Sequence, residues 1–270
     1  MYDLHCHLLP NIDDGARDLP TALEMARIAA GDGITHLACT PHIYPGLFEN
    51  TAESIAKAVQ DLDQELKSHG IALELSYGAD IQVVPEMVGN LHSCIFPTIN
   101  ESRYFLFEPS HHVPLQNFDG YVFDSISAGF VPMITHPERL RWLEDHYREF
   151  VSAAHAGAWI QLTAGSLVGR FGKAPRYWAE KMLDDGIVHL LATDGHNLKS
   201  RPPLLAEGAE AAAKYVGKEE ASRLVLERPG SVWENAEPAD ISQPPGLGDF
   251  DKDPGRKAGG LLRRLFRSAR

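Results

Sequence analysis

Apolar residues recur along the chain in one repeated rhythm: a short apolar run, a turn, and then a longer stretch with helical spacing. The short runs predict six or seven strands, within the segments 1–6, 34–40, 72–83, 104–110, 130–138, 158–165 and 188–196. The longer stretches between them predict helices, within the segments 18–33, 51–70, 86–93, 149–157 and 176–186. Asp18 is the expected N-cap of the first helix, because its side chain can accept a backbone hydrogen bond there.

Strands that alternate with helices predict an α/β fold with a parallel sheet and crossover helices. An open doubly wound sheet and a closed barrel both fit this order. The barrel is favoured because polar residues follow the apolar part of several strands, as at His42, Glu108, His136 and Asp194. Active sites of β/α barrels draw on many strand ends, whereas an open sheet gathers its ligands mainly at one switch point. Neither a G-x-G-x-x-G motif nor a P-loop is found in the sequence.

Composition and charge indicate which partners and which cellular location to expect. The chain has 270 residues, 44% of them hydrophobic, and a formal net charge of -12, which disfavours nucleic acid as a partner. Its cysteines, Cys6, Cys39 and Cys94, are odd in number and far apart, so we expect free thiols and a cytoplasmic location. The sequence contains neither an apolar run of about 20 residues nor the pattern of a removable leader.

The composition changes after residue 236. Residues 1–236 form the predicted domain, and the rest, rich in Pro, Gly and Asp at first, predicts a flexible linker and tail over 237–270. Residues 256–270 contain six basic residues and no acidic one. Two interpretations stay open for this segment: a disordered solubilising tail, or a short amphipathic helix that makes peripheral contact with anionic lipid.

Histidines and carboxylates at the strand ends are the candidate chemistry. His5 and His7 lie two residues apart, so a strand places both on one face and Cys6 on the other. Taken singly, each such residue is an ordinary polar group at a loop edge. Together, nine nitrogen and oxygen ligands are too many for one closed structural zinc and indicate a two- or three-metal hydrolytic centre. The nine are His5, His7, Asp14, His42, Asp80, Glu108, His136, Asp194 and His196.

Two other phosphatase or hydrolase chemistries are excluded by the sequence. A cysteine phosphatase needs C-x5-R, but Ile12, Pro45 and Asn100 stand six residues after the three cysteines. The serine elbow G-x-S-x-G is also missing. We interpret the pair His111-His112 as an exposed loop pair, with a position at the substrate mouth as the alternative.

Four motifs carry a family resemblance: "DLHCHLLPNIDDGA", "TPHIYPG", "THPERL" and "ATDGHN". In order and spacing they resemble those of the PHP (polymerase and histidinol phosphatase) superfamily. The residues within these motifs are most similar to those of the PHP-type protein-tyrosine phosphatases of bacterial capsule and exopolysaccharide systems. The resemblance covers about residues 1–236.

The resemblance implies a distorted TIM-like (β/α)7 barrel with two or three divalent metal ions. Manganese is the expected metal, with Fe, Co and Zn as alternatives. The implied ligands are His5, His7 and Asp194 for the first metal, Glu108 and His136 for the second, and Asp14, His42 and His196 for the third. Asp80 stands where the family usually has a glutamate that bridges the first two metals. Because aspartate is one methylene shorter, it can bind one metal only or change the spacing of the pair.

The implied activity is hydrolysis of phosphotyrosine by attack of a metal-activated water on phosphorus. Arg139 and Arg201 are the implied phosphate-binding residues, since a guanidinium offers a bidentate fork to phosphate. The implied partner is a membrane-anchored tyrosine kinase of polysaccharide assembly. Two alternatives stay open: a small-molecule phosphatase of the histidinol-phosphatase type, and a non-catalytic scaffold stabilised by metal.

Overall fold

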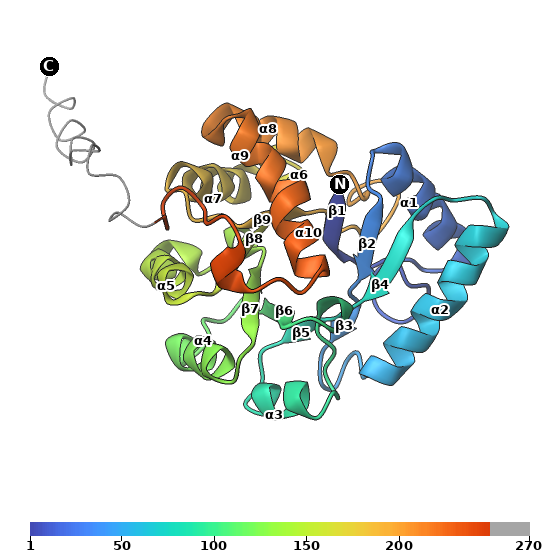
Figure 1. Cartoon of the computed structure of the whole chain (residues 1–270), viewed down its shortest axis with the longest axis horizontal. Coiled ribbons are helices and arrows are strands. Elements are labelled where there is room, and N and C mark those ends of the chain that lie inside the picture. Colours follow the sequence, from blue (N-terminus) through green and yellow to red (C-terminus); the bar gives the residue numbers. More distant parts are fainter. Residues whose placement is uncertain (249–270) are drawn as a thin grey trace, which may run out of the picture.

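Parallel strands surround one axis, with helices outside them (Figure 1). The computed structural model describes residues 1–248. The strands are β1 (Tyr2–Cys6), β2 (His36–Cys39), β3 (His42–Ile43), β4 (Glu74–Tyr77), β5 (Asp80–Gln82), β6 (Tyr104–Glu108), β7 (Val131–Thr135), β8 (Trp159–Thr163) and β9 (Leu190–Ala192). The α-helices are α1 (Leu19–Gly31), α2 (Ala52–Ser68), α3 (Met87–His92), α4 (Phe118–Ser127), α5 (Leu143–Ala156), α6 (Ala164–Leu167), α7 (Lys173–Asp184), α8 (Ala206–Val216), α9 (Lys218–Ser222) and α10 (Arg228–Trp233).

The strands pair in two sets, in the orders β1-β2-β4 and β3-β5-β6-β7-β8-β9. Backbone hydrogen bonds join the sets across two bends: Gly78 N donates to Cys39 O at 3.0 Å, and Asp80 N donates to Pro41 O at 3.1 Å. β2 and β3 are therefore two halves of one bent strand, and so are β4 and β5. Gly78 lies at the second bend, where a Cβ would lie 2.4 Å from Ile99 Cδ1, so a larger residue would require the Ile99 side chain to shift.

The first and last strands close the ring. Asp194 N donates to His5 O at 2.8 Å, and His7 N donates to Gly195 O at 2.9 Å. With the bent strands counted once each, the order is that of a seven-stranded barrel. The predicted barrel, rather than the open sheet, is confirmed, and it agrees with the (β/α)7 architecture that the resemblance implies.

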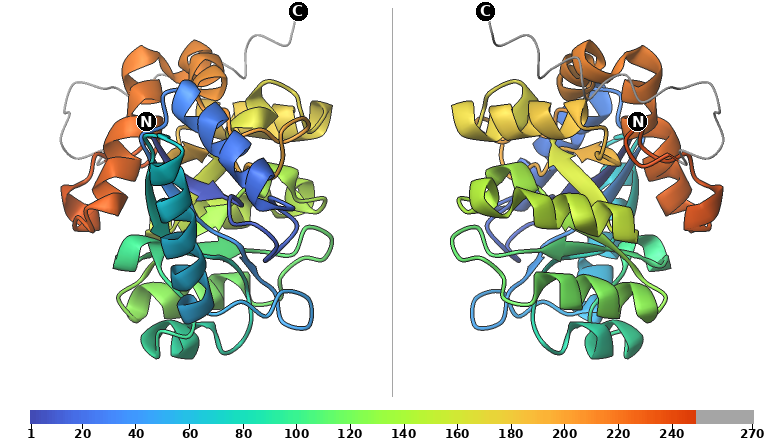
Figure 2. Two further views of the ribbon diagram at one scale, coloured as in Figure 1. Left: turned by 90° about the vertical axis from the view of Figure 1, so that its right-hand side faces the viewer. Right: turned by 90° about the vertical axis from the view of Figure 1, so that its left-hand side faces the viewer.

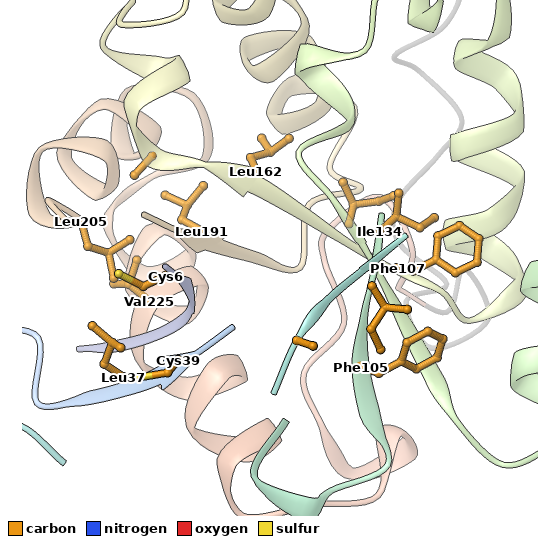
Figure 3. Packing of buried hydrophobic residues seen from close by; sticks show 14 of the residues in the cluster. Cys6, Leu37, Cys39, Phe105, Phe107, Ile134, Leu162, Leu191, Leu205 and Val225 are labelled. Carbon is orange, nitrogen blue, oxygen red and sulfur yellow. The ribbon is translucent and has the colours of Figure 1, made fainter. Parts of the chain in front are cut away.

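Alternate residues of each strand belong to two cores. Phe105 and Phe107 of β6 point toward the helices and belong to the outer core, together with Ile134, Leu162 and Leu191 of the following strands (Figure 3). Residues of the opposite parity form a second cluster inside the barrel, namely Tyr104, Leu106, Val131, Met133, Trp159, Leu190 and Ala192. At the carboxyl ends of the strands the same inward positions become polar, as Glu108 follows Leu106 in β6.

One end of the barrel is covered. Val232 of α10 joins the inner cluster, and the carbonyl of Trp233 accepts a hydrogen bond from Asn100 Nδ2 at 2.9 Å. Figure 2 shows α10 at this end and the loops that follow β3 and β6 at the other. The polar ends of the strands therefore face the end of the barrel that carries these loops.

The predicted helices lie close to the observed ones. α1 begins after Asp18, whose side chain accepts a hydrogen bond from Thr21 N at 2.8 Å. In the part of the chain that the structure describes, α4, the short α6 and the helices between Ala206 and Trp233 were not predicted from the sequence. α4 has weak local signals, since Gly120 lies inside it and its N-cap Asn117 has a φ of 59° in place of an ordinary cap geometry. Among the described residues, no helix combines the length and apolarity needed to cross a bilayer.

The chain just beyond the predicted domain packs against it. Arg228 donates from Nε to Ser242 O at 2.6 Å and from Nη2 to Gln243 O at 3.1 Å. Ile241 is buried against the inner cluster. The boundary after residue 236 stays a prediction, and the predicted basic tail at 256–270 lies outside the described residues.

His189, directly before β9, should make the stability of the fold depend on pH. Burial, together with the charge of Arg228, lowers the pKa of His189 to about 3, and its Nδ1 accepts a hydrogen bond from Ile160 N at 3.1 Å. In the unfolded chain His189 takes up a proton at about pH 6.5, whereas in the folded chain it does so only near pH 3. Acidification from about pH 6.5 toward 3 should therefore cost about 1 kcal/mol of folding free energy per pH unit at this residue.

The measurement is urea unfolding of the wild type and His189→Asn at pH 7, 6 and 5. The asparagine oxygen can accept the Ile160 hydrogen bond but does not titrate. We expect the variant to lose less stability on acidification than the wild type. Equal losses would show that His189 does not carry this dependence.

Candidate active site

The open end of the barrel brings together all nine predicted ligand residues. They come from β1 and its following loop, β3, β5, β6, and the turns after β7 and β9. Their ligand atoms fall into overlapping groups within 4.8 Å, and the carboxylates and imidazoles of most members are buried. His5 and His196 lie far apart in the sequence, and they come together because the first and last strands of the barrel are neighbours.

The first predicted group lies where the first and last strands meet. His5 Nε2 lies 3.2 Å from His7 Nε2. Asp194 Oδ1 lies 3.5 Å from His5 Nε2 and 3.4 Å from His7 Nε2. Three ligand atoms thus converge on one small volume, which suits a divalent cation.

The second predicted group contains an additional histidine. His136 Nε2 lies 3.9 Å from Glu108 Oε1, and His111 Nε2 lies 3.8 Å from the same oxygen. The interpretation of His111-His112 as an exposed pair is correct for His112 but wrong for His111, whose side chain is largely covered. The spacing of His111 from Glu108, three residues, is the only sequence signal that could have indicated it.

The third predicted group is nearest to solvent. Asp14 Oδ1 lies 3.5 Å from His42 Nε2 and 3.4 Å from His196 Nε2, and the Asp14 side chain is 54% exposed. The other ring nitrogen of His42 lies 3.4 Å from both Asp80 Oδ2 and Glu108 Oε2. His42 therefore connects this group to the second one.

Asp80 lies at the centre of the cluster. Its Oδ2 is 3.4 Å from His5 Nε2, 3.4 Å from His42 Nδ1 and 3.7 Å from His136 Nε2. The carboxylate is fully buried, yet neither oxygen has a hydrogen-bond partner within the described chain. An ionised carboxylate without donors is costly in a protein interior, so these residues fit bound divalent cations. Bridging of two metals by Asp80 stays a prediction.

Hydrogen bonds on the far ring nitrogens orient three of the imidazoles. The partners are Gln161 Oε1 for His5 Nδ1 at 2.9 Å, Asp13 Oδ2 for His7 Nδ1 at 2.7 Å, and the Asp194 carbonyl for His196 Nδ1 at 3.0 Å. Partners of this kind fix the tautomer and leave Nε2 free for a metal. Asp13 also accepts the Gly15 N–H at 2.9 Å, so it shapes the turn and orients a candidate ligand.

Burial and neighbouring charges shift the pKa values of the imidazoles in opposite directions. Burial alone would lower the pKa of His5, but the carboxylates of Asp80 and Asp194 raise it to about 9. Burial, reinforced by His7, lowers the pKa of His196 to about 4, and burial with Arg139 lowers that of His136 well below its usual value. His136 and His196 are therefore already in the neutral form that metal binding requires, whereas His5 would have to give up a proton when it binds a cation.

Two of the predicted ligand residues leave their strands in the left-handed backbone region. His136 has a φ of 35° and Asp194 a φ of 50°. Such conformations are uncommon outside glycine and concentrate at functional sites, where the surrounding structure maintains them. Both residues follow a buried strand directly or closely, so this backbone turn aims their side chains into the cluster.

Arg139 and Arg201, the predicted phosphate-binding residues, border the first group. Arg201 Nη2 lies 2.6 Å from Asp194 Oδ2, and Arg139 Nη1 contacts the same oxygen. Asp194 thus faces the imidazoles with one oxygen and the guanidiniums with the other. Phe171 lies against both arginines, with its ring centroid 4.4 Å from Arg139 Cζ. No motif in the sequence had indicated Phe171.

Comparison with known proteins agrees with this geometry. The model of the family described as "Capsular polysaccharide synthesis, CpsB/CapC" matches residues 1–234. The tyrosine-protein phosphatase YwqE of Bacillus subtilis (strain 168) is 33% identical over 220 residues, covering 81% of this chain and 86% of that protein. The putative tyrosine-protein phosphatase CapC of Staphylococcus aureus is 29% identical over 208 residues, covering 77% and 81%.

Solved structures show the same fold. One from work on YwqE of Bacillus subtilis and CpsB of Streptococcus pneumoniae, described as unique metal-dependent tyrosine phosphatases, superimposes with a TM-score of 0.86. It is 29% identical and covers 91% of this chain and 98% of that one. A beta-aspartyl dipeptidase from Fervidobacterium islandicum AW-1 has a TM-score of 0.51 at 14% identity, covering 87% of this chain and 75% of its own, which shows likeness of fold alone.

Proposed function

Because the chain belongs to the CpsB/CapC family of capsular polysaccharide synthesis, we propose that it is a metal-dependent protein-tyrosine phosphatase. One observation carries the proposal. A mostly buried cluster of imidazoles and carboxylates, several of whose nitrogen and oxygen atoms have no hydrogen-bond partner within the described chain, lies beside two arginines at the open end of the barrel. This arrangement suits hydrolysis of a phosphate monoester, which needs charge neutralisation and an anion-binding fork.

We propose two or three divalent ions, held by the nine residues in the groups described above, with His111 as a further ligand to the second ion. Bound ions would lower the pKa of water and offset the charge of the phosphoryl oxygens. Manganese is the proposed metal, with Fe, Co and Zn as alternatives, since imidazole and carboxylate ligands accept all four. Metal analysis of the purified protein, followed by activity measurements with each added ion, tests the number and identity.

The chain's own residues have separate tasks in this proposal. Arg139 and Arg201 donate hydrogen bonds to the phosphoryl oxygens and hold the group in one orientation. Gln161 and Asp13 keep the rings of His5 and His7 in a fixed tautomer. The covered end of the barrel confines the reaction to the open end, where the loops after β3 and β6 border the approach.

The proposed substrate is a phosphotyrosyl segment of a membrane-anchored tyrosine kinase in polysaccharide assembly. Three free cysteines support a reducing compartment such as the cytoplasm. The deciding experiment compares turnover of a phosphotyrosyl peptide with that of histidinol phosphate by the metal-loaded protein. We expect preference for the peptide. Cleavage of histidinol phosphate alone would favour the small-molecule phosphatase, and no cleavage of either would favour the scaffold.

Thiol chemistry has no part in this proposal, which gives a simple prediction. Cys6 and Cys39 are buried, and burial raises the pKa of both thiols well above the usual value, whereas Cys94 is exposed. Iodoacetamide should label Cys94 and leave phosphatase activity unchanged. Mass spectrometry of the labelled protein and an activity assay of the same sample check this. Loss of activity in proportion to labelling would contradict metal-based catalysis.

A further inference from the structure

Phe171 provides one aromatic face to the two arginines of the proposed phosphate site. Its ring centroid lies 4.4 Å from Arg139 Cζ and 5.8 Å from Arg201 Cζ. Both guanidiniums also contact one oxygen of Asp194, so two like charges lie close together. A guanidinium over an aromatic face is attracted by the ring, which favours this crowded arrangement.

The local fold creates room for the ring. Phe171 lies between α6 and α7, in a turn where Arg170 N donates to Gly165 O at 3.0 Å. A Cβ on Gly165 would lie 3.2 Å from Phe171 Cε2, which is tighter than nearly all such contacts. Gly172, which follows, has a φ of 94° that favours glycine. Both glycines therefore help to place the ring beneath the arginines.

The backbone of Arg139 is fastened to the same corner of the barrel. Glu138 is fully buried, and its Oε1 accepts hydrogen bonds from Thr163 N at 3.0 Å and Ser166 Oγ at 2.7 Å. Thr163 ends β8 and Ser166 lies in α6, immediately before the turn that carries Phe171. Arg139 is thus held at its base by Glu138 and along its side chain by Phe171.

One donor of the arginine pair has no partner within the described chain. Arg201 Nε is buried and has no hydrogen-bond partner within the described chain, and a guanidinium carries five N–H donors. We propose that Phe171 is a positioning residue that holds Arg139 and Arg201 together, with their free N–H groups directed at a phosphoryl anion. This inference rests on the proposed function, because it assigns the arginines to the phosphoryl group of the substrate.

The test uses the full metal-loaded chain, with inorganic phosphate as the probe. Phe171→Leu keeps an apolar side chain but removes the aromatic face, and Phe171→Tyr retains it. We expect Phe171→Leu to weaken phosphate binding, measured by calorimetry, by about 5- to 10-fold. The same variant should lower kcat/KM for a phosphotyrosyl peptide similarly, whereas Phe171→Tyr should restore both. Tyr177→Leu, which removes an exposed aromatic ring on α7, is the matched control and should change neither.

Gly165→Ala supplies a second variant, because the added methyl group would push the ring by a few tenths of an ångström without removing it. Metal content and melting temperature should stay at wild-type values in all of these proteins. Unchanged phosphate affinity in both Phe171→Leu and Gly165→Ala would overturn the inference, as would a Tyr variant as impaired as the Leu variant. If the wild type bound phosphate but cleaved no aryl phosphate, the proposed function would fail, while the phosphate affinities would still decide the role of Phe171.

Discussion

Asp194→Asn should remove nearly all hydrolysis of a phosphotyrosyl peptide. The carboxylate faces the imidazoles of His5, His7 and His196 with one oxygen and both arginines with the other. An amide would lose the negative charge that attracts the cations on both sides. Loss of about 4 kcal/mol of transition-state stabilisation corresponds to a decrease of about 10³-fold in kcat/KM.

The substitution keeps the shape of the side chain, and asparagine tolerates the left-handed backbone at this position. Metal content measured by mass spectrometry should fall together with activity. Asp184→Asn, an exposed aspartate on α7, is the control and should behave as the wild type. Wild-type activity in Asp194→Asn, or in His136→Ala, would refute the assignment of these residues to the metal centre.

Arg139→Ala should lower kcat/KM by about 10²-fold, the usual effect of removing one charged donor to a developing anion. The variant loses the proposed donor to the phosphoryl group as well as the ion pair with Asp194. Weaker inhibition by inorganic phosphate should accompany the loss, because phosphate uses the same donors. Arg139→Lys should recover only part of the activity, since an ammonium group cannot form a bidentate fork.

Arg141→Ala is the matched control for this experiment. Arg141 lies two residues further along and is exposed, and its backbone N–H, which the substitution retains, donates to His111 O at 3.1 Å. Steady-state kinetics of the three variants separate the two positions. Equal losses in the variants at 139 and 141 would point to a general effect of positive charge instead of a specific fork.

Much of the site follows from the sequence because its residues lie at predictable points of predictable strands. His5 and His7 follow the period of two, and Glu108 ends a run of buried residues. Ligands at strand ends are aligned by the barrel itself, whatever the sequence distance between them. For these residues the local sequence pattern therefore predicts the position in the folded barrel.

Other parts of the site depend on contacts that no local pattern encodes. His111 and Phe171 lie in turns, and their roles come from the side chains of Glu108 and Arg139, which approach through space. The bend between β4 and β5 brings Gly78 close to Ile99, a contact that no local pattern encodes. The helix α4, whose local sequence signals are weak, is likewise stabilised by packing against the barrel, which outweighs local propensity.

Closure of the ring between β1 and β9 has a consequence for how activity arises during synthesis. The backbone hydrogen bond between Asp194 and His5 joins two residues that lie far apart in the sequence of the barrel domain. A ribosome-bound chain that has not yet exposed β9 lacks Asp194, His196 and Arg201, so we expect nascent and truncated chains to be inert. Metal bound between the first and last strands would stabilise the closed ring and so slow proteolysis of the finished protein.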